Sequence, residues 1–229
     1  ALITFVIEWR SQSLTSRIAI PSIALAAMLA ILSASPTVLV LALAVGVVTV
    51  ALTIVRHAPA ERRNVVQWVL GVLVALALAA AFALRHPIIA LMDAGSDFSI
   101  RATLWNTILD FSALKPIQGW GWFGSWARGE YPFTYINFQL DDHHQSALNS
   151  YFDVLLQLGA AGLALFLLLG GVALVRSWLV ASVRRSVVYA WTPLMLVTLA
   201  VESMFESFTI VGAGWFMLVL CALRAGQSR

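Results

Sequence analysis

Two histidines and several acidic and amide side chains lie close together between Asp141 and Gly162, in the stretch DDHHQSALNSYFDVLLQLGAAG. Histidine suits proton transfer because its unperturbed pKa of about 6.5 lies near neutral pH. The stretch begins polar and then becomes apolar, which predicts a helix that enters a membrane. Polar residues at such a junction, His143 and His144 above all, are candidates for chemistry.

The position of these side chains depends on where the helix begins. Aspartate is a good N-cap, so we predict that Asp141 or Asp142 caps the helix. Residues three and four apart then share a face. One face would carry His144, Leu148, Tyr151 and Leu155, and a neighbouring polar stripe would carry Gln145, Asn149 and Asp153.

The composition is that of an integral membrane protein. Hydrophobic residues make up 61% of the chain and charged residues 11%, against roughly 45–50% and about 25% in soluble proteins. The single cysteine, Cys221, excludes an intrachain disulfide and a cysteine metal site, and we expect it to be a small buried residue. The opening ALITFVIEW resembles the end of an apolar segment, so we expect the chain to be the C-terminal part of a longer protein.

We predict an all-α membrane protein, a polytopic bundle of about six transmembrane helices, because a bilayer core needs around 20 apolar residues per helix. Pro36 should separate the first two spans as a hairpin, and Pro193 should kink the fifth. The predicted spans are residues 18–34, 36–55, 65–84, 151–175, 187–205 and 208–223.

Charge placement predicts the orientation. Ten of the 14 Lys and Arg residues lie on one side of these spans, which makes that side cytoplasmic. The other four are Arg85, Arg101, Lys115 and Arg128. We therefore expect a multi-pass protein of the bacterial cytoplasmic (inner) membrane, with the active site facing outward. Its parts would be three spans in 1–84, an extracytoplasmic loop carrying the active site in 85–150, and three spans with a cytoplasmic tail in 151–229.

The long loop is predicted to be structured and functional. It is rich in tryptophan, tyrosine and phenylalanine, which disordered segments lack, and these rings would either lie at the membrane interface or stack on sugars. Within it we predict a helix over 99–114 with one apolar face, made by Ile100, Leu104, Ile108, Phe111 and Leu114. A glycine-rich turn follows, with glycines at 119, 121 and 124.

Several motifs resemble those of the O-antigen ligase and Wzy-type polymerase family of bacterial envelope glycosyltransferases. In chain order they are Arg101-A-T-L-Trp105, Pro116-I-Q-Gly119-W-Gly121, a histidine-bearing segment leading to Asn149-S-Tyr151, and L-Gly159-A-A-Gly162-L. The resemblance covers about residues 18–223. It implies transfer of a glycan from a polyprenyl (undecaprenyl) diphosphate carrier to an acceptor sugar on the outer face of the membrane, with no metal or other cofactor.

The partners that the resemblance implies are a polyprenyl diphosphate-linked glycan donor, a glycan or glycolipid acceptor and the lipid bilayer, with no nucleic acid. Arg101 would bind the diphosphate, since its planar fork gives paired charge-assisted hydrogen bonds; the alternative is an interfacial Arg101 that pairs with Asp97 or a headgroup. His144 is the expected base, His143 is the alternative, and both are otherwise solvated residues at a helix start.

We assign substrate binding to five further residues: Asn149, Trp105, Arg128, Tyr151 and Glu202. A hydrogen bond at a helix interface would explain Asn149 equally well, and an interfacial position would explain Glu202 with Glu206, which we place four residues apart on the fifth helix. The sequence departs from the family pattern at two positions. Leu148 stands where the family often has histidine, and Pro36 stands where it has a second arginine, for which Arg128 or Arg85 could compensate.

The motifs do not separate a ligase from a polysaccharide polymerase. A transporter or flippase subunit is an alternative of another class, although transporters usually place ionisable residues at the bilayer midplane, whereas the polar residues here gather at one surface. The two departures also leave open a catalytically inactive scaffold.

Overall fold

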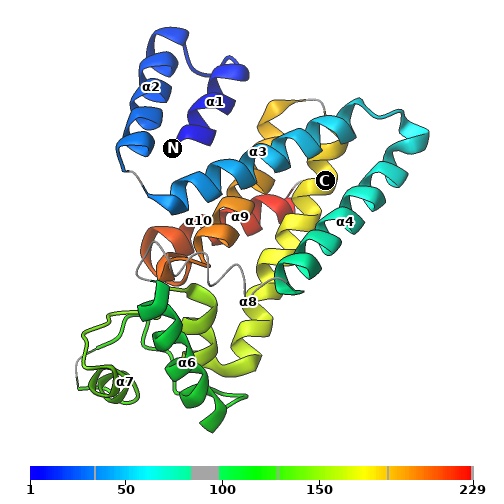
Figure 1. Cartoon of the computed structure of the whole chain (residues 1–229). Helices are drawn as coiled ribbons and strands as arrows, with labels where there is room; N and C mark the ends of the chain where they lie inside the picture. Colours follow the sequence, from blue (N-terminus) through cyan, green and yellow to red (C-terminus); the bar gives the residue numbers. More distant parts are fainter. Residues whose placement is uncertain (34, 84–97, 128, 185, 228–229) are drawn as a thin grey trace. The chain divides into compact units, whose positions relative to one another are not determined.

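The structure, a computed structural model, describes residues 1–33, 35–83, 98–127, 129–184 and 186–227 (Figure 1). Within these ranges the regular secondary structure is helical throughout, which confirms the predicted all-α fold. The helices are α1 (Leu2–Arg10), α2 (Ser16–Leu32), α3 (Pro36–His57), α4 (Ala60–Ala83), α6 (Phe98–Leu114), α7 (Phe133–Leu140), α8 (Ser150–Val183), η1 (Val187–Ala190), α9 (Trp191–Glu202), η2 (Ser207–Ile210) and α10 (Gly212–Gln227).

The chain forms two compact units. The first comprises residues 1–56 and 164–229, and the second comprises residues 57–163. Helix α8 contributes to both, since its first residues belong to the second unit and the remainder to the first. The predicted functional residues of the long loop therefore lie in the second unit.

In the first unit, α1 and α2 form an antiparallel pair (Figure 1), and apolar residues of α8, α9 and α10 pack into a core that contains Cys221. Cys221 is fully buried, as the sequence predicts. Polar contacts tie distant segments together: Arg56 Nε donates to the Ala181 carbonyl oxygen at 2.7 Å, and Trp191 Nε1 lies 3.1 Å from Thr4 Oγ1.

Two of the described helices, α3 and α8, are long and apolar enough to cross a membrane. Helix α2 and the η1–α9 segment are apolar but shorter, so the six-span topology stays a prediction. Pro36 begins α3, as predicted. The predicted hairpin of the first two spans is not seen in the described helices, because α2 packs against α1 and not against α3. The predicted kink at Pro193 is wrong, because α9 begins at Trp191 and Pro193 lies in its first turn, where a missing N–H breaks no helical hydrogen bond.

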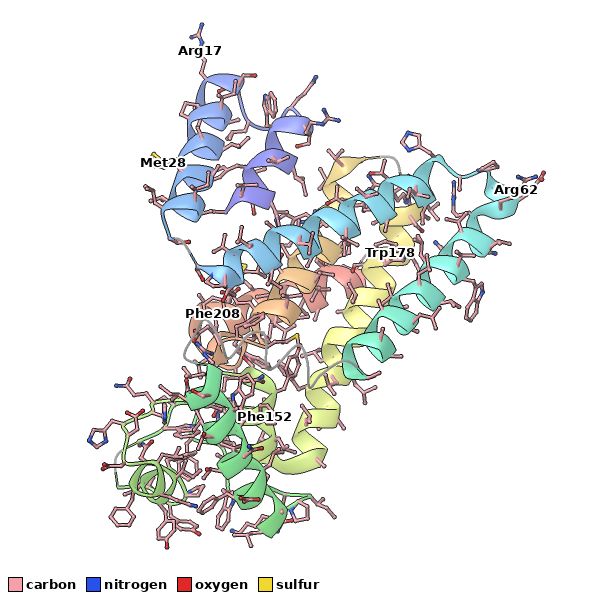
Figure 2. All side chains as sticks on the ribbon, viewed as in Figure 1. Arg17, Met28, Arg62, Phe152, Trp178 and Phe208 are labelled. Atoms are coloured by element: carbon pink, nitrogen blue, oxygen red, sulfur yellow. The ribbon has the colours of Figure 1, made fainter. Side chains whose placement is uncertain are left out.

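The second unit has an apolar core between α6, α7 and the start of α8. Helix α6 confirms the prediction for 99–114 to within one residue, and the middle of its predicted apolar face is buried. Ile100 and Leu114, at the two ends of that face, are exposed. Figure 2 shows Phe152 of α8 beside α6 in this core, where its ring stacks on Trp105 with a centroid separation of 5.4 Å.

Helix α8 is interrupted at Gly159, whose φ of 64° and ψ of −167° are not helical. A continuous helix would bond the N–H groups of residues 160 and 161 to the carbonyls of residues 156 and 157. Here those carbonyls accept hydrogen bonds from Trp120 and Gly121 at 3.1 and 2.8 Å. The N–H groups of 160 and 161 donate in turn to Pro116 and Ile117 at 2.8 and 3.2 Å.

The interruption is thus an exchange of backbone hydrogen bonds between α8 and the glycine-rich turn. It requires glycine on both sides. A Cβ on Gly119 would overlap the Gln157 carbonyl, and a Cβ on Gly159 would overlap the Ile117 carbonyl. Both glycines also have positive φ, which glycine adopts without steric cost. The two glycine motifs of the sequence therefore form one structural feature, which fixes the turn against α8.

Candidate functional site

The segment that carries the histidines is a loop, and the predicted helix start at Asp141 or Asp142 is wrong. Asp141 has a left-handed φ of 50° and ends α7. Leu148 is also left-handed, with φ of 51°, and α8 begins only at Ser150. His144 and Leu148 therefore do not share a helix face. The prediction that His144 and Asn149 lie on adjacent faces of one helix is wrong for the same reason.

Asn149 caps α8 instead. Its Oδ1 accepts hydrogen bonds from the backbone N–H groups of Tyr151 and Phe152 at 2.9 and 3.2 Å, which satisfies two donors that the helix leaves unpaired. Asparagine and aspartate both cap helices and both tolerate the left-handed region. The sequence therefore offered two valid starts, and the structure takes the later one.

Helix α6 holds the segment immediately before this cap. Arg101 Nη1 donates to the Leu148 carbonyl oxygen at 3.3 Å, and one turn later Trp105 Nε1 donates to the Ala147 carbonyl oxygen at 2.9 Å. The arginine and tryptophan of the first motif thus contact two successive carbonyls at the approach to α8. This arrangement keeps the half-buried Arg101 guanidinium next to Leu148 and Asn149.

A buried carboxylate, Asp153, holds three segments together. Its Oδ1 accepts from Trp126 Nε1 at 2.6 Å and from Gln157 Nε2 at 3.3 Å, and its Oδ2 accepts from the Ala147 N–H at 2.9 Å. The side chains of Asp153 and Gln157 are fully buried. Gln157 also accepts from the N–H groups of Phe123 and Gly124 at 2.8 and 3.0 Å.

The assignment of site residues from the sequence did not include Asp153, Gln157 or Trp126. A signal was present, because two polar residues four apart, in an otherwise apolar helix, are costly to bury unless they are hydrogen-bonded. An acidic residue in the first turn is also favourable to the helix dipole. These residues form a network that joins the start of α8 to the glycine-rich turn, to Trp126 and to Ala147.

The backbone of His144 is fixed by Asn137 of α7. Asn137 Oδ1 accepts from the His144 N–H at 3.0 Å, and Asn137 Nδ2 donates to the His144 carbonyl oxygen at 2.9 Å. The His144 ring is 11% exposed, and its Nε2 lies 3.3 Å from Asp142 Oδ2. Asp142 Oδ1 in turn accepts from the His143 N–H at 2.6 Å.

Both histidines line a cavity of about 490 Å³ in the second unit. Its volume falls within the usual range for ligand pockets. The cavity combines ionisable groups with aromatic walls; its described lining is Trp126, Ala127, Gly129, Thr134, Asn137, Phe138, Asp141, Asp142, His143, His144 and Gln145.

The predicted site residues form two groups. His143 and His144 line the cavity, whereas Arg101, Trp105, Asn149 and Tyr151 lie around the start of α8. Arg101 is not among the described residues of the cavity lining.

The remaining assignments fall elsewhere. Arg128 and Arg85 lie outside the described residues. Glu202 is the last residue of α9, in the first unit, and Glu206 follows the end of that helix, so the two do not share a continuous helix as predicted. Among the described residues, no group of three or more His, Cys, Asp or Glu side chains is placed to hold a metal ion.

The fold and the cavity together define the class: a helical protein with long apolar helices and a histidine- and carboxylate-lined pocket in an aromatic-rich unit. The comparison with protein families then gives the family, because the model described as O-antigen ligase matches residues 21–167. The chain belongs to the O-antigen ligase family. Neither the curated proteins nor the solved structures gave a match.

Family membership confirms the resemblance drawn from the motifs. It supports an enzyme of the O-antigen ligase or polymerase type, which acts in polysaccharide biosynthesis at a bacterial membrane and uses lipid-linked glycans. The matched residues contain the whole of the exchange between α8 and the glycine-rich turn, the Asp153 network and the histidine cavity.

Proposed function

We propose that this protein transfers a glycan from a polyprenyl diphosphate carrier to a hydroxyl group of an acceptor sugar, on the outer face of the bacterial cytoplasmic membrane. The observation that carries this proposal is the family match over residues 21–167. The pairing of His144 with Asp142 in a cavity of the same segment supports it chemically.

His144 acts as the general base. A carboxylate at Nε2 favours the tautomer with the proton on that nitrogen, which leaves Nδ1 to accept the proton of the acceptor hydroxyl. The hydroxyl oxygen then forms a bond to the anomeric carbon of the donor sugar. The bond from that carbon to the diphosphate breaks, and the diphosphate leaves with the electron pair. Asp142 stabilises the imidazolium that results.

Arg101 binds the departing diphosphate. The guanidinium has a planar array of N–H donors that matches phosphate oxygens in pairs. Its bond to the Leu148 carbonyl orients it at the start of α8. For one donor molecule to use both groups, the sugar must extend from the Arg101 region toward the cavity with the polyprenyl chain between apolar helices. Trp105, Asn149, Tyr151, Arg128 and Glu202 remain proposed substrate contacts.

Transfer by the chain in proteoliposomes tests this function. The donor is a radiolabelled undecaprenyl diphosphate-linked oligosaccharide; the acceptor is a glycolipid in one arm and a second lipid-linked oligosaccharide in the other. The first product indicates a ligase and the second a polymerase. We expect His144→Gln to lower the rate by a factor of about 100 or more and Arg101→Ala by about 10 to 100.

Matched controls are His57→Gln and Arg17→Ala, which change an exposed histidine and an exposed arginine that are not in the described cavity lining. They should transfer at the wild-type rate. Unimpaired transfer in both His144→Gln and Arg101→Ala would refute the site assignment. Movement of the lipid-linked donor across the bilayer without transfer would favour a transporter or flippase subunit instead, and the absence of both activities would favour a scaffold.

A further inference from the structure

A row of aromatic side chains lies on the surface of the second unit, and only one of its members lines the histidine cavity. Tyr131, Tyr135 and Phe138 are 50%, 54% and 79% exposed, and the half-buried Trp120 adjoins them. We call Trp120, Tyr131, Tyr135 and Phe138 the aromatic track. What distinguishes these rings is that they adjoin one another, because contiguous exposed apolar surface marks interaction sites.

The rings of the track form a continuous series. The centroid separations are 4.8 Å from Trp120 to Tyr131, 6.3 Å from Tyr131 to Tyr135 and 6.3 Å from Tyr135 to Phe138. The buried ring of Phe111 lies beneath the middle of the series, 6.2 Å from Tyr131 and 5.9 Å from Tyr135. Ring side chains project outward from α7 in Figure 2. The track is therefore supported from below and open on its outer side.

One end of the track reaches the histidine cavity, because Phe138 belongs to both. At the other end, Lys115 Nζ lies 4.1 Å from the Trp120 ring centroid. A chain molecule that lies on the track would thus run from Lys115 toward His144. Its end would enter the cavity in which the acceptor hydroxyl is deprotonated.

The chemistry of the track fits a sugar chain better than lipid. Pyranose rings present C–H faces that stack on aromatic rings, with hydroxyl groups at the edges for the tyrosine hydroxyls and neighbouring carboxylates. Glu130 precedes Tyr131, and Asp141 and Asp142 follow α7. Carboxylates are repelled by anionic lipid headgroups and are costly to insert into a membrane. The rings are also spaced at about the length of a sugar unit.

We propose that the aromatic track binds the glycan chain of the acceptor and guides its terminal sugar to His144. This inference rests on the proposed glycosyl transfer, since it assigns the acceptor side of that reaction. The track acts on binding, whereas His144 acts on the chemical step. Acceptors with several sugars would gain affinity from the track, and an acceptor with a single sugar would reach the cavity without using it.

The test compares Tyr131→Ala and Tyr135→Ala, at two track positions outside the cavity lining, with Trp122→Ala, which removes another half-exposed ring outside the track. In the proteoliposome assay we expect KM for a long acceptor to rise about tenfold in each track variant, as for loss of an aromatic anchor. The kcat value and the KM for a single-sugar acceptor should stay near wild type. Trp122→Ala should match wild type throughout.

Equal KM values for the track variants and Trp122→Ala would overturn the inference. Loss of activity that is the same for long and short acceptors, and that varies with the anionic lipid content of the vesicles, would also overturn it and would place the track against the bilayer. Titration calorimetry with the free acceptor oligosaccharide separates this inference from the proposed reaction. Binding that weakens in the track variants supports the track even if wild type transfers no glycan.

Discussion

Replacing Gly159 by alanine should strongly destabilise the second unit. An added Cβ would overlap the Ile117 carbonyl oxygen and would lie 2.7 Å from the Gly119 backbone nitrogen. These atoms belong to the backbone, so no side chain can move aside. The φ of 64° with ψ of −167° lies in a region that is essentially restricted to glycine.

The magnitude follows from these contacts. The backbone strain costs about 1–3 kcal/mol. If α8 and the glycine-rich turn move apart to relieve the overlap, some of the four hydrogen bonds between them break, and each is worth about 1 kcal/mol. We therefore expect Gly159→Ala to lower the free energy of unfolding by about 4 kcal/mol, which is large for a single substitution. For a chain of this size that corresponds to roughly 10 °C in Tm.

The assay is thermal unfolding in detergent micelles, followed by tryptophan fluorescence. The matched control is Gly170→Ala in the same helix, where a Cβ meets nothing within 4 Å and φ is not positive. Alanine there should be neutral or should stabilise the helix by up to about 1 kcal/mol. If Gly159→Ala unfolds at the same temperature as Gly170→Ala, the exchange of hydrogen bonds at the α8 interruption does not exist as described.

Two further substitutions test the supporting residues. Asp153→Ala leaves the Trp126 and Ala147 donors buried without their acceptor, so we expect a loss of about 3 kcal/mol in the free energy of unfolding; a loss below about 1 kcal/mol in the same fluorescence assay would contradict the network. Asn149→Ala should cost about 1 kcal/mol by removing the cap, whereas Asn149→Asp should keep the stability. Normal glycan transfer by Asn149→Asp would indicate a capping residue only, and impaired transfer at unchanged Tm would support substrate contact.

Local patterns predicted much of the second unit correctly. The apolar spacing from Ile100 to Leu114 predicted α6, which ends at Leu114 as expected. The sequence also predicted a glycine-rich turn after this helix, and its glycines at 119, 121 and 124 have positive φ. These features can be predicted from the sequence because each depends only on residues that are close to it in the chain.

The helix α7 was missed although a signal exists. Phe133 and Ile136 are buried at helical spacing, and Pro132 stands just before the first turn. The aromatic residues of this segment are equally typical of a membrane interface and of a sugar-binding surface, so the helical spacing does not stand out.

The misplaced start of α8 has a different cause: Asp141 and Asn149 have similar preferences for helix caps. The contacts that hold the segment before Asn149, from Arg101 and Trp105 of α6, come from residues distant in sequence.

The pairing of Gly119 with Gly159 was beyond local analysis. Each glycine predicts a turn or a close approach, but nothing near it in sequence identifies the backbone that approaches. The same holds for Asp153, whose donors Trp126 and Ala147 come from separate parts of the loop. The glycines and the buried aspartate can be identified from the sequence, but the groups that they contact can be identified only from the tertiary structure.

The partial positive charge at the amino end of α8 is offset by groups of the protein itself. Helix starts commonly attract phosphate through their exposed N–H groups, yet here the amide oxygen of Asn149 occupies two of them and the Asp153 carboxylate lies in the first turn. An anion that approached this point would meet oxygen atoms. Recognition of a diphosphate near α8 must therefore come from cationic side chains. A substitution of Arg101 should weaken donor binding more than a substitution that alters the charge at the helix start.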